Sequence, residues 1–178
     1  RPAQGLDPLI SSLEDSDIWI RTAAAQALGE YRHPDAIQPL VHHLDHDLPP
    51  VRIAAIEALG KSGDDRVKQV IFDCAPESDL EVRRAAILSL GRVPGEEVFD
   101  YLMFATTDAD WRIRAAAVTA VAGRGDRTAL PALYTALLAP DTYVHHSAVL
   151  ALDKLPDRES FPPLFPALAH SDILDQVS

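Results

Sequence analysis

One pattern of residues recurs every 31 positions along almost the whole chain. The pattern contains an arginine in its first four occurrences and a histidine in the fifth: Arg21, Arg52, Arg83, Arg114, His145. An alanine follows three residues later each time: Ala24, Ala55, Ala86, Ala117, Ala148. A fixed period without gaps is typical of tandem repeats, in which each unit packs mainly on its neighbours. The period therefore constrains the fold more tightly than any single motif does.

The second unit indicates how each repeat folds. Its first half, residues 36–44, carries an apolar stripe at i, i+3, i+4 and i+7, which predicts an amphipathic helix: Ile37, Leu40, Val41, Leu44. Its second half begins with two prolines, which a first helical turn tolerates, and ends at Gly60, which is suited to a helix terminus. Each unit is therefore predicted to be a hairpin of two helices, helix A and helix B, joined by a short turn.

We predict five complete hairpins over residues 6–29, 35–60, 65–91, 96–122 and 127–153, and a sixth helix A over 158–169. In four units helix B follows an aspartate that can cap its free backbone N–H groups: Asp17, Asp79, Asp110, Asp141. The second unit departs from this column, with Leu48 at that place. We expect one domain, residues 1–178, of about five and a half repeats. It is either a fragment of a longer array or a chain whose ends pack on something else.

The composition argues against several classes of protein. A net charge of -11 opposes nucleic-acid binding, because phosphate contacts need a clustered basic surface. No apolar run approaches the ~20 residues of a membrane-spanning helix. The single cysteine cannot form an internal disulfide. We expect a cytoplasmic protein, and the bias toward alanine, aspartate and arginine indicates a bacterial source.

Three stretches carry the repeat pattern on helix B: DIWIRTAAAQALG, DLEVRRAAILSLG and, altered at its last two positions, DWRIRAAAVTAVA. The unit resembles the short HEAT-like repeat, in particular the type named after phycobilisome lyases. The resemblance covers nearly all of the chain. It implies an all-α fold, a right-handed α-solenoid of stacked hairpins whose B helices line the concave surface. Repeats of this family serve in scaffolds, chromophore lyases, a hydroxylase and DNA-repair proteins, so the resemblance alone names no function.

The positions that vary between units lie on one stripe of helix B. In the first unit they are residues 19, 22, 26 and 30, whose spacing places them on one helical face. The stripe is mixed in charge and size, which is typical of a surface shaped for a partner, although solvent exposure alone also permits such variation. The candidate binding residues on or beside the stripe are Trp19, Arg84, Leu88, Arg92, Trp111, Arg112, Tyr143, His146 and Leu150. Trp19 and Trp111 could instead fill gaps between units.

Three other features have simpler structural interpretations. The repeated arginine stands four residues after the capping aspartate, and we expect it to reach its own cap or a neighbouring loop and so tie adjacent units together. His42 and His46 are one helical turn apart, a spacing that can hold a metal, but a solvated surface cluster explains them as well and we assign no metal site. Cys74 falls in a column of small residues, so we expect a buried thiol rather than a nucleophile.

Two functions remain. The favoured one is a non-enzymatic scaffold module without a cofactor, which docks a protein segment across the concave helix-B face. Its local arginines and aromatic residues suit an acidic peptide segment. The alternative, implied by the resemblance, is a subunit similar to phycobilin lyases that binds a tetrapyrrole. In that case Arg84, Arg92 and Arg112 would face the propionates, and Tyr143 or Trp19 would stack on the rings.

Overall fold

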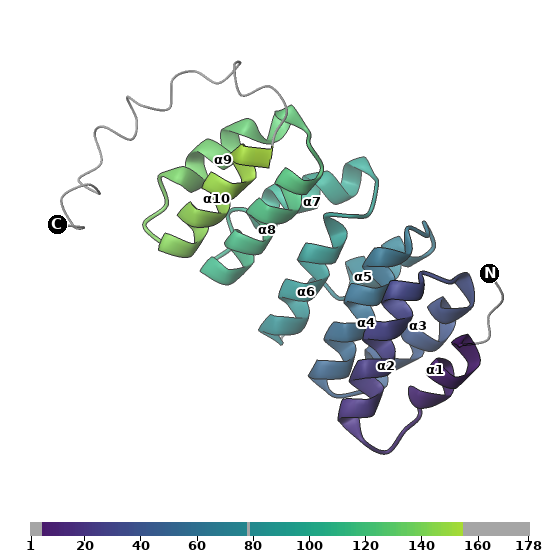
Figure 1. Cartoon of the computed structure of the whole chain (residues 1–178). Helices are drawn as coiled ribbons and strands as arrows, with labels where there is room; N and C mark the ends of the chain where they lie inside the picture. The colour runs from purple at the N-terminus through teal and green to yellow at the C-terminus, as the bar shows by residue number, and fades with distance from the viewer. Residues whose placement is uncertain (1–4, 78, 155–178) are drawn as a thin grey trace.

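The computed structural model describes residues 5–77 and 79–154, with the side chains of His46 and Lys154 left out. Over these residues the chain alternates between A and B helices that stack as an α-solenoid (Figure 1). The A helices are α1 (Leu6–Ser12), α3 (Ile37–His46), α5 (Val67–Asp73), α7 (Glu96–Ala105) and α9 (Leu130–Leu137). The B helices are α2 (Ile18–Tyr31), α4 (Pro49–Ser62), α6 (Leu80–Leu90), α8 (Trp111–Gly123) and α10 (Thr142–Lys154). Short 3-10 turns, η1 (Pro34–Ala36) and η2 (Arg127–Ala129), precede α3 and α9.

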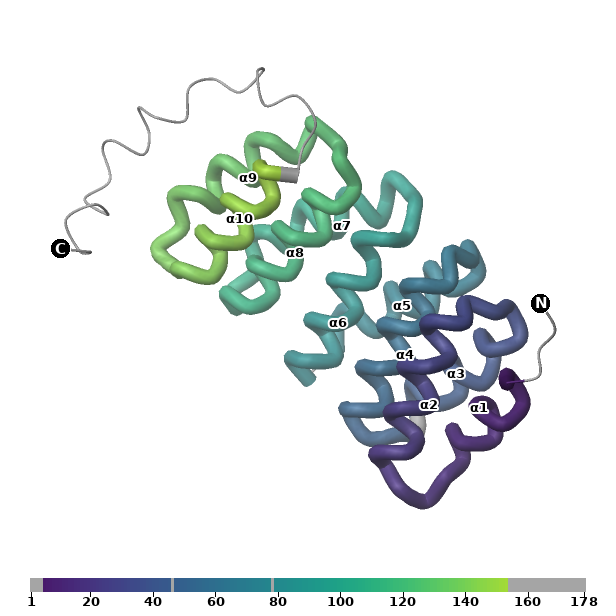
Figure 2. The backbone as a smooth tube through the Cα atoms, viewed as in Figure 1, coloured from purple at the N-terminus to yellow at the C-terminus, as the bar shows by residue number. Residues whose placement is uncertain are grey.

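All five predicted hairpins are present, and Figure 2 traces the chain as it passes through them in turn. The predicted sixth helix A lies outside the described residues. Three of the expected aspartate caps accept backbone N–H groups at the start of a B helix: Asp17, Asp79, Asp110. The expectation that Gly60 ends its helix is wrong, because α4 continues to Ser62 and ends at Gly63, which has a φ of 71°. Gly60 instead allows α4 to pack closely against Ser89 of α6.

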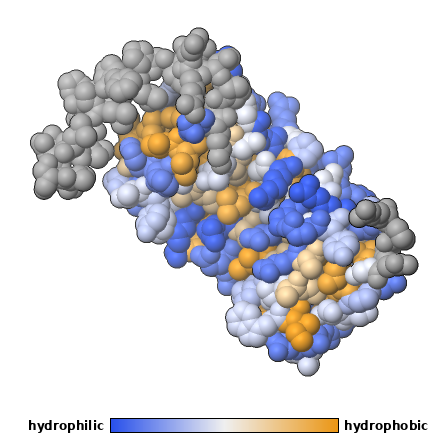
Figure 3. Space-filling model, viewed as in Figure 1, coloured by the Kyte–Doolittle hydropathy of each residue, from blue (hydrophilic) through white to orange (hydrophobic). Residues whose placement is uncertain are grey.

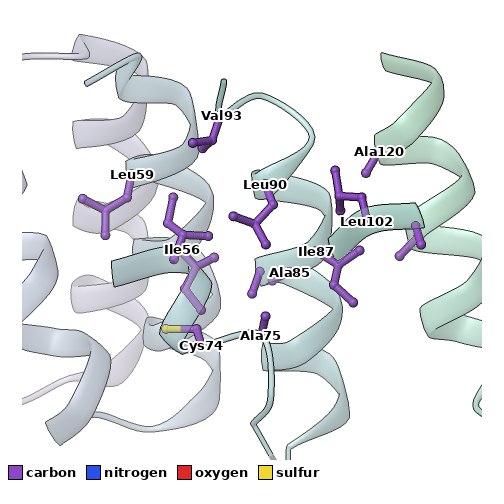
Figure 4. Packing of buried hydrophobic residues seen from close by; sticks show 14 of the residues in the cluster. Ile56, Leu59, Cys74, Ala75, Ala85, Ile87, Leu90, Val93, Leu102 and Ala120 are labelled. Carbon is purple, nitrogen blue, oxygen red and sulfur yellow. The ribbon is translucent and has the colours of Figure 1, made fainter. Parts of the chain in front are cut away.

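The alanine column of the repeat is buried in all five units, with 0–3% exposure: Ala24, Ala55, Ala86, Ala117, Ala148. Figure 4 shows how side chains of successive units meet in one core, with Leu90 on the side of α6 toward Ile56 and Leu59 of α4, and Ile87 on its other side beside Leu102. Because every unit contributes the same positions to this core, the units stack rather than fold separately.

Glycines on the B helices allow the backbones of successive units to approach closely. A Cβ atom added at Gly91 would lie only 2.8 Å from the Cα atom of Ala120 on the next B helix. Three pairs show this approach at three successive interfaces: Gly29–Ala58, Gly60–Ser89, Gly91–Ala120. Gly60 is therefore needed for close packing rather than for helix termination.

The B helices pack more closely on one another than the A helices do. Consecutive B helices pack directly on one another, from α2 against α4 to α8 against α10. Within the part of the chain that the structure describes, neighbouring A helices make far fewer contacts with one another. Successive units therefore meet mainly through their B helices.

The repeated arginines tie neighbouring units together. Of the two predicted partners, the helix's own cap and a neighbouring loop, it is the neighbouring loop that they reach. Each one reaches a carboxylate of the next unit, 25 to 27 residues later in the chain. Arg21, Arg83 and Arg114 do so rather than pair with the aspartate four residues before them. The pairs are Arg21–Asp47, Arg52–Glu77, Arg83–Asp108 and Arg114–Asp141. Because these guanidiniums are paired and largely buried, they do not form an open anion site.

His145, at the arginine position of the fifth unit, keeps only one of the contacts that the arginines make, the one within its own unit. Its Nδ1 atom lies 2.6 Å from the carbonyl oxygen of Leu137. Arg52 donates from Nε to the equivalent carbonyl of its own unit, that of Leu44. The histidine thus keeps the contact within the unit, and its ring is too short to extend to a following unit. An ordinary substitution explains it.

Candidate functional site

A hollow of about 520 Å³ lies on the helix-B face between α6, α8 and α10. Its aromatic wall is a stack of Trp111 and Tyr143, with ring centroids 4.7 Å apart and an angle of 21° between the ring planes. Six predicted site residues from three different units line it: Arg84, Leu88, Trp111, Arg112, Tyr143, His146. Only the stacking of the units brings these residues together.

Both arginines of this hollow already have a carboxylate partner on or beside their own helix. Arg84 Nε donates to Glu81 at 2.9 Å. Arg112 donates to Asp110 through Nε at 3.0 Å and Nη2 at 2.8 Å, and these hydrogen bonds hold the pKa of Asp110 at about 2. The hollow is therefore close to charge balance, whereas the sequence suggested a basic surface. The reason is that the start of each B helix supplies an acidic residue within reach of each arginine.

A second hollow of about 500 Å³ continues along the same face toward α4. It shares Leu88 and Thr119 with the first hollow, so the two lie side by side across α4, α6, α8 and α10, and together we call them the groove. Arg92 and Glu57 line the second hollow, and neither makes an ion pair within residues 5–77 and 79–154. Arg92 is thus exposed in the groove with its guanidinium open to a ligand.

Two predicted residues lie outside the groove. Trp19 is 74% exposed at the start of α2 in the first unit, and Leu150 is 48% exposed on α10. Sequence reasoning also missed Ser147, which lines the first hollow. The sequence does distinguish this position, because Ser147 is the one polar residue in a column of the repeat that is otherwise alanine: Ala23, Ala54, Ala85, Ala116.

One histidine near the end of α3, His43, packs into the repeat interface, whereas His42 is exposed. His43 is buried, and its Nδ1 atom lies 3.2 Å from Oδ2 of Asp47, the carboxylate that also binds Arg21. The His42–His46 hypothesis has no further support in this region, where the side chain of His46 is not described. Within the side chains that are described, no three His, Cys, Asp or Glu residues are grouped so as to hold a metal ion.

Cys74 is buried, as predicted, and its thiol donates to the carbonyl oxygen of Val70. Burial raises the pKa of this thiol to about 11. At pH 8 we expect it to react with a thiol reagent roughly 100-fold more slowly in the folded protein than in urea, because the thiolate is the reacting species. A colorimetric thiol assay with and without urea measures this ratio, and equal rates would contradict the burial of Cys74.

None of the described helices has the length and apolar character needed to cross a membrane.

A family model described as HEAT repeats matches residues 1–51, 48–108 and 102–176. No curated protein matches the chain.

Solved structures show the same fold. The chain is similar to the complex of CpcE and CpcF of phycocyanin lyase from Nostoc sp. PCC7120, with a TM-score of 0.68 and 24% identity, over 94% of this chain and 70% of that chain. It is also similar to a designed armadillo repeat protein in complex with the peptide (KR)4, with a TM-score of 0.54 and 21% identity, over 84% and 81% of the two chains. At these identities the likeness concerns the fold alone.

Proposed function

The chain belongs to the HEAT-repeat family, and we propose that it is a non-enzymatic cytoplasmic module that holds a segment of a partner protein in the groove. The observation that carries this proposal is the Trp111–Tyr143 stack, which lines a hollow on the helix-B face while Trp111 also packs against the core. Tyr143 is 66% exposed, so this aromatic surface is in contact with water. Tryptophan, tyrosine and arginine are the residues found most often at binding hot spots.

The shape of the groove suits an extended peptide better than a compact ligand. The two hollows lie side by side across four B helices, so a ligand that fills both must be elongated. A designed armadillo repeat protein of similar fold was solved with a peptide, (KR)4. A solenoid can offer successive pockets to successive side chains of such a segment.

The charges of the groove favour an acidic segment with an apolar side chain. Arg92 has no carboxylate partner within the described residues, so its guanidinium can donate to a carboxylate of the ligand. The pairs Arg84–Glu81 and Arg112–Asp110 are exposed, and such pairs contribute only about 0–1 kcal/mol, so a ligand carboxylate can replace the internal one. An aromatic or aliphatic side chain of the ligand would pack on Trp111.

Binding of two matched fluorescent peptides tests this function. One peptide alternates phenylalanine with aspartate, and the other carries lysine at each aspartate position. We expect the acidic peptide to bind more tightly, and Trp111→Ala and Arg92→Ala each to weaken it at least tenfold. Fluorescence anisotropy measures both.

The matched control is Phe104→Ala. Phe104 is 74% exposed on α7, an A helix, and does not line the groove. This variant should leave the affinity unchanged. Equal affinities of the two peptides, or equal losses in Phe104→Ala and Trp111→Ala, would remove the groove as the binding surface.

A tetrapyrrole is the second candidate ligand, because the Trp111–Tyr143 stack offers a flat aromatic surface and a phycocyanin lyase complex shares the fold. Of the three arginines expected at the propionates, Arg84 and Arg112 are already paired and Arg92 lies in the other hollow. Trp19 lies outside the groove, which leaves Tyr143 to stack on a ring. An absorbance shift of added bilin that is lost in Tyr143→Ala would support this alternative over the peptide.

A further inference from the structure

A column of charged residues at the C-terminal ends of the B helices is only partly paired. The column repeats every 31 positions: Glu30, Lys61, Arg92, Gly123. Lys61 Nζ lies 2.7 Å from Oε1 of Glu30, so the first two members neutralise each other across one interface. Arg92 has a lysine before it and a glycine after it in the same column. The repeat itself therefore supplies Arg92 with no carboxylate.

Open space lies where the carboxylate beside Arg92 is missing. Gly123 lines the second hollow together with Arg92. A Cβ atom added at Gly123 would meet nothing within 4 Å, so the described side chains leave this part of the hollow unfilled. A glycine lets a ligand approach the backbone closely. The hollow thus has room for an acidic side chain of the ligand against Gly123 and within reach of Arg92.

Glu57 is the second charged residue of this hollow without a partner. It is exposed on α4, one helical turn before Lys61, a spacing that favours an ion pair. Lys61 is held by Glu30 instead. The neighbours of Glu57 in its own column of the repeat are Gln26 and Leu88, which carry no charge. Among the described residues, Glu57 is therefore a carboxylate without a cation.

The aromatic stack and the two unpaired charges lie in a fixed order along the groove. Trp111 is on α8, Arg92 lies just after α6, and Glu57 is on α4. Because each B helix packs directly on the next, a segment that starts on the aromatic stack and crosses the helices in turn reaches Arg92 before Glu57. Figure 3 shows one face of the molecule, on which blue, hydrophilic surface lies beside smaller orange, hydrophobic areas. The surface of the stack is thus mixed, so charge can select a ligand.

We infer that the groove selects a segment with an apolar, an acidic and a basic side chain, in that order. The apolar side chain packs on Trp111, the acidic one pairs with Arg92 over Gly123, and the basic one pairs with Glu57. This inference rests on the proposed function and specifies the peptide further, because each unpaired charge of the hollow requires its opposite. A uniformly acidic segment would place a like charge on Glu57. Glu57 is therefore the residue that determines this specificity.

Two matched peptides test the charge order. Both contain the alternating phenylalanine–aspartate sequence, which one extends with two lysines and the other with two glutamates. Each is made with the extension at either end, so that both directions of the bound segment are covered. In one direction we expect the lysine peptide to bind at least about threefold more tightly, a modest factor because ion pairs open to water are weak. Fluorescence anisotropy measures the affinities.

A charge reversal at Glu57 separates a local ion pair from general attraction to a protein of net charge -11. Glu57→Lys should reverse the preference, so that the glutamate peptide binds more tightly. Glu96→Lys is the matched control, because it changes the net charge equally, and Glu96 is exposed on α7 and does not line the groove. This control should keep the preference for lysine. Thermal melts of both variants should match the unchanged chain.

The possible failures of the two proposals are distinguishable. Equal affinities of the two extended peptides for the unchanged chain, or equal effects of Glu57→Lys and Glu96→Lys on the preference, overturn the charge order. The proposed function still stands in that case, provided that Trp111→Ala weakens binding of both peptides. If neither extended peptide binds the unchanged chain, the groove is not a peptide site and both proposals are wrong.

Discussion

Replacing Gly91 with leucine should lower the free energy of unfolding by about 3 kcal/mol or more. A Cβ atom at this position would lie 2.8 Å from Cα, 2.9 Å from Cβ and 3.0 Å from the carbonyl oxygen of Ala120. Two of these atoms belong to the backbone, so no rotamer change can relieve the overlap. The helices α6 and α8 must move apart, which also loosens the packing of Leu90.

Urea unfolding followed by circular dichroism measures this change, and the melting temperature should fall by about 6–12 °C for a chain of this size. Gly123→Leu is the matched control. Gly91 is the C-cap of α6 and Gly123 is the last residue of α8, but a Cβ atom at Gly123 would meet nothing within 4 Å. This control should stay within about 0.5 kcal/mol of the unchanged protein. Similar losses in the two variants would show that helix propensity, and not the approach of α6 to α8, determines the effect.

Asp47→Asn should lower the free energy of unfolding by about 2 kcal/mol at pH 7. The Asp47 side chain is 7% exposed and accepts Nε and Nη2 of Arg21, each at 2.8 Å, across the first repeat interface. The hydrogen bonds from Arg21, together with those from the Leu48 N–H and His43, hold its pKa at about 2, below the ordinary value of 3.8. That lowering of the pKa measures how strongly the fold favours the ionised carboxylate.

The effect depends on pH in a defined direction. Because the pKa of Asp47 is lower in the folded than in the unfolded chain, its contribution is complete above about pH 4 and is lost as the pH falls through about 2. The unchanged protein and Asp47→Asn should therefore differ most at pH 7 and converge near pH 2. Asp45→Asn is the control, since Asp45 is exposed on the same helix and makes no ion pair among the described residues. An equal difference at both pH values would show that Asp47 acts by packing rather than by charge.

The repeat architecture was predictable because the 31-residue period reports which positions face a neighbouring unit. A position that contacts the same kind of neighbour in every unit experiences the same packing, so its residue type recurs. This reasoning located the buried alanine column and the helix caps at Asp17, Asp79 and Asp110. It also predicted correctly that the repeated arginines connect units.

The partners of these arginines were less predictable. The aspartate four residues earlier on the chain was the obvious candidate for Arg83, yet that aspartate caps the helix and Arg83 reaches Asp108 of the next unit. The role of Gly60 was misjudged for the same kind of reason, since its function depends on how closely Ser89 approaches. Both depend on distances between units, which periodicity does not contain.

The sequence by itself determined the class of fold, the five hairpins within the described residues and the identity of the buried columns, because these follow from a periodic pattern of apolar and small residues. Only the tertiary structure decided which varied residues share a surface. Trp111 and Tyr143 are 32 positions apart in sequence but stack within one hollow, while Trp19, in the column of Tyr143, stays apart from it. The physical reason is that a hollow forms between helices of different units, and its lining depends on how the units are spaced.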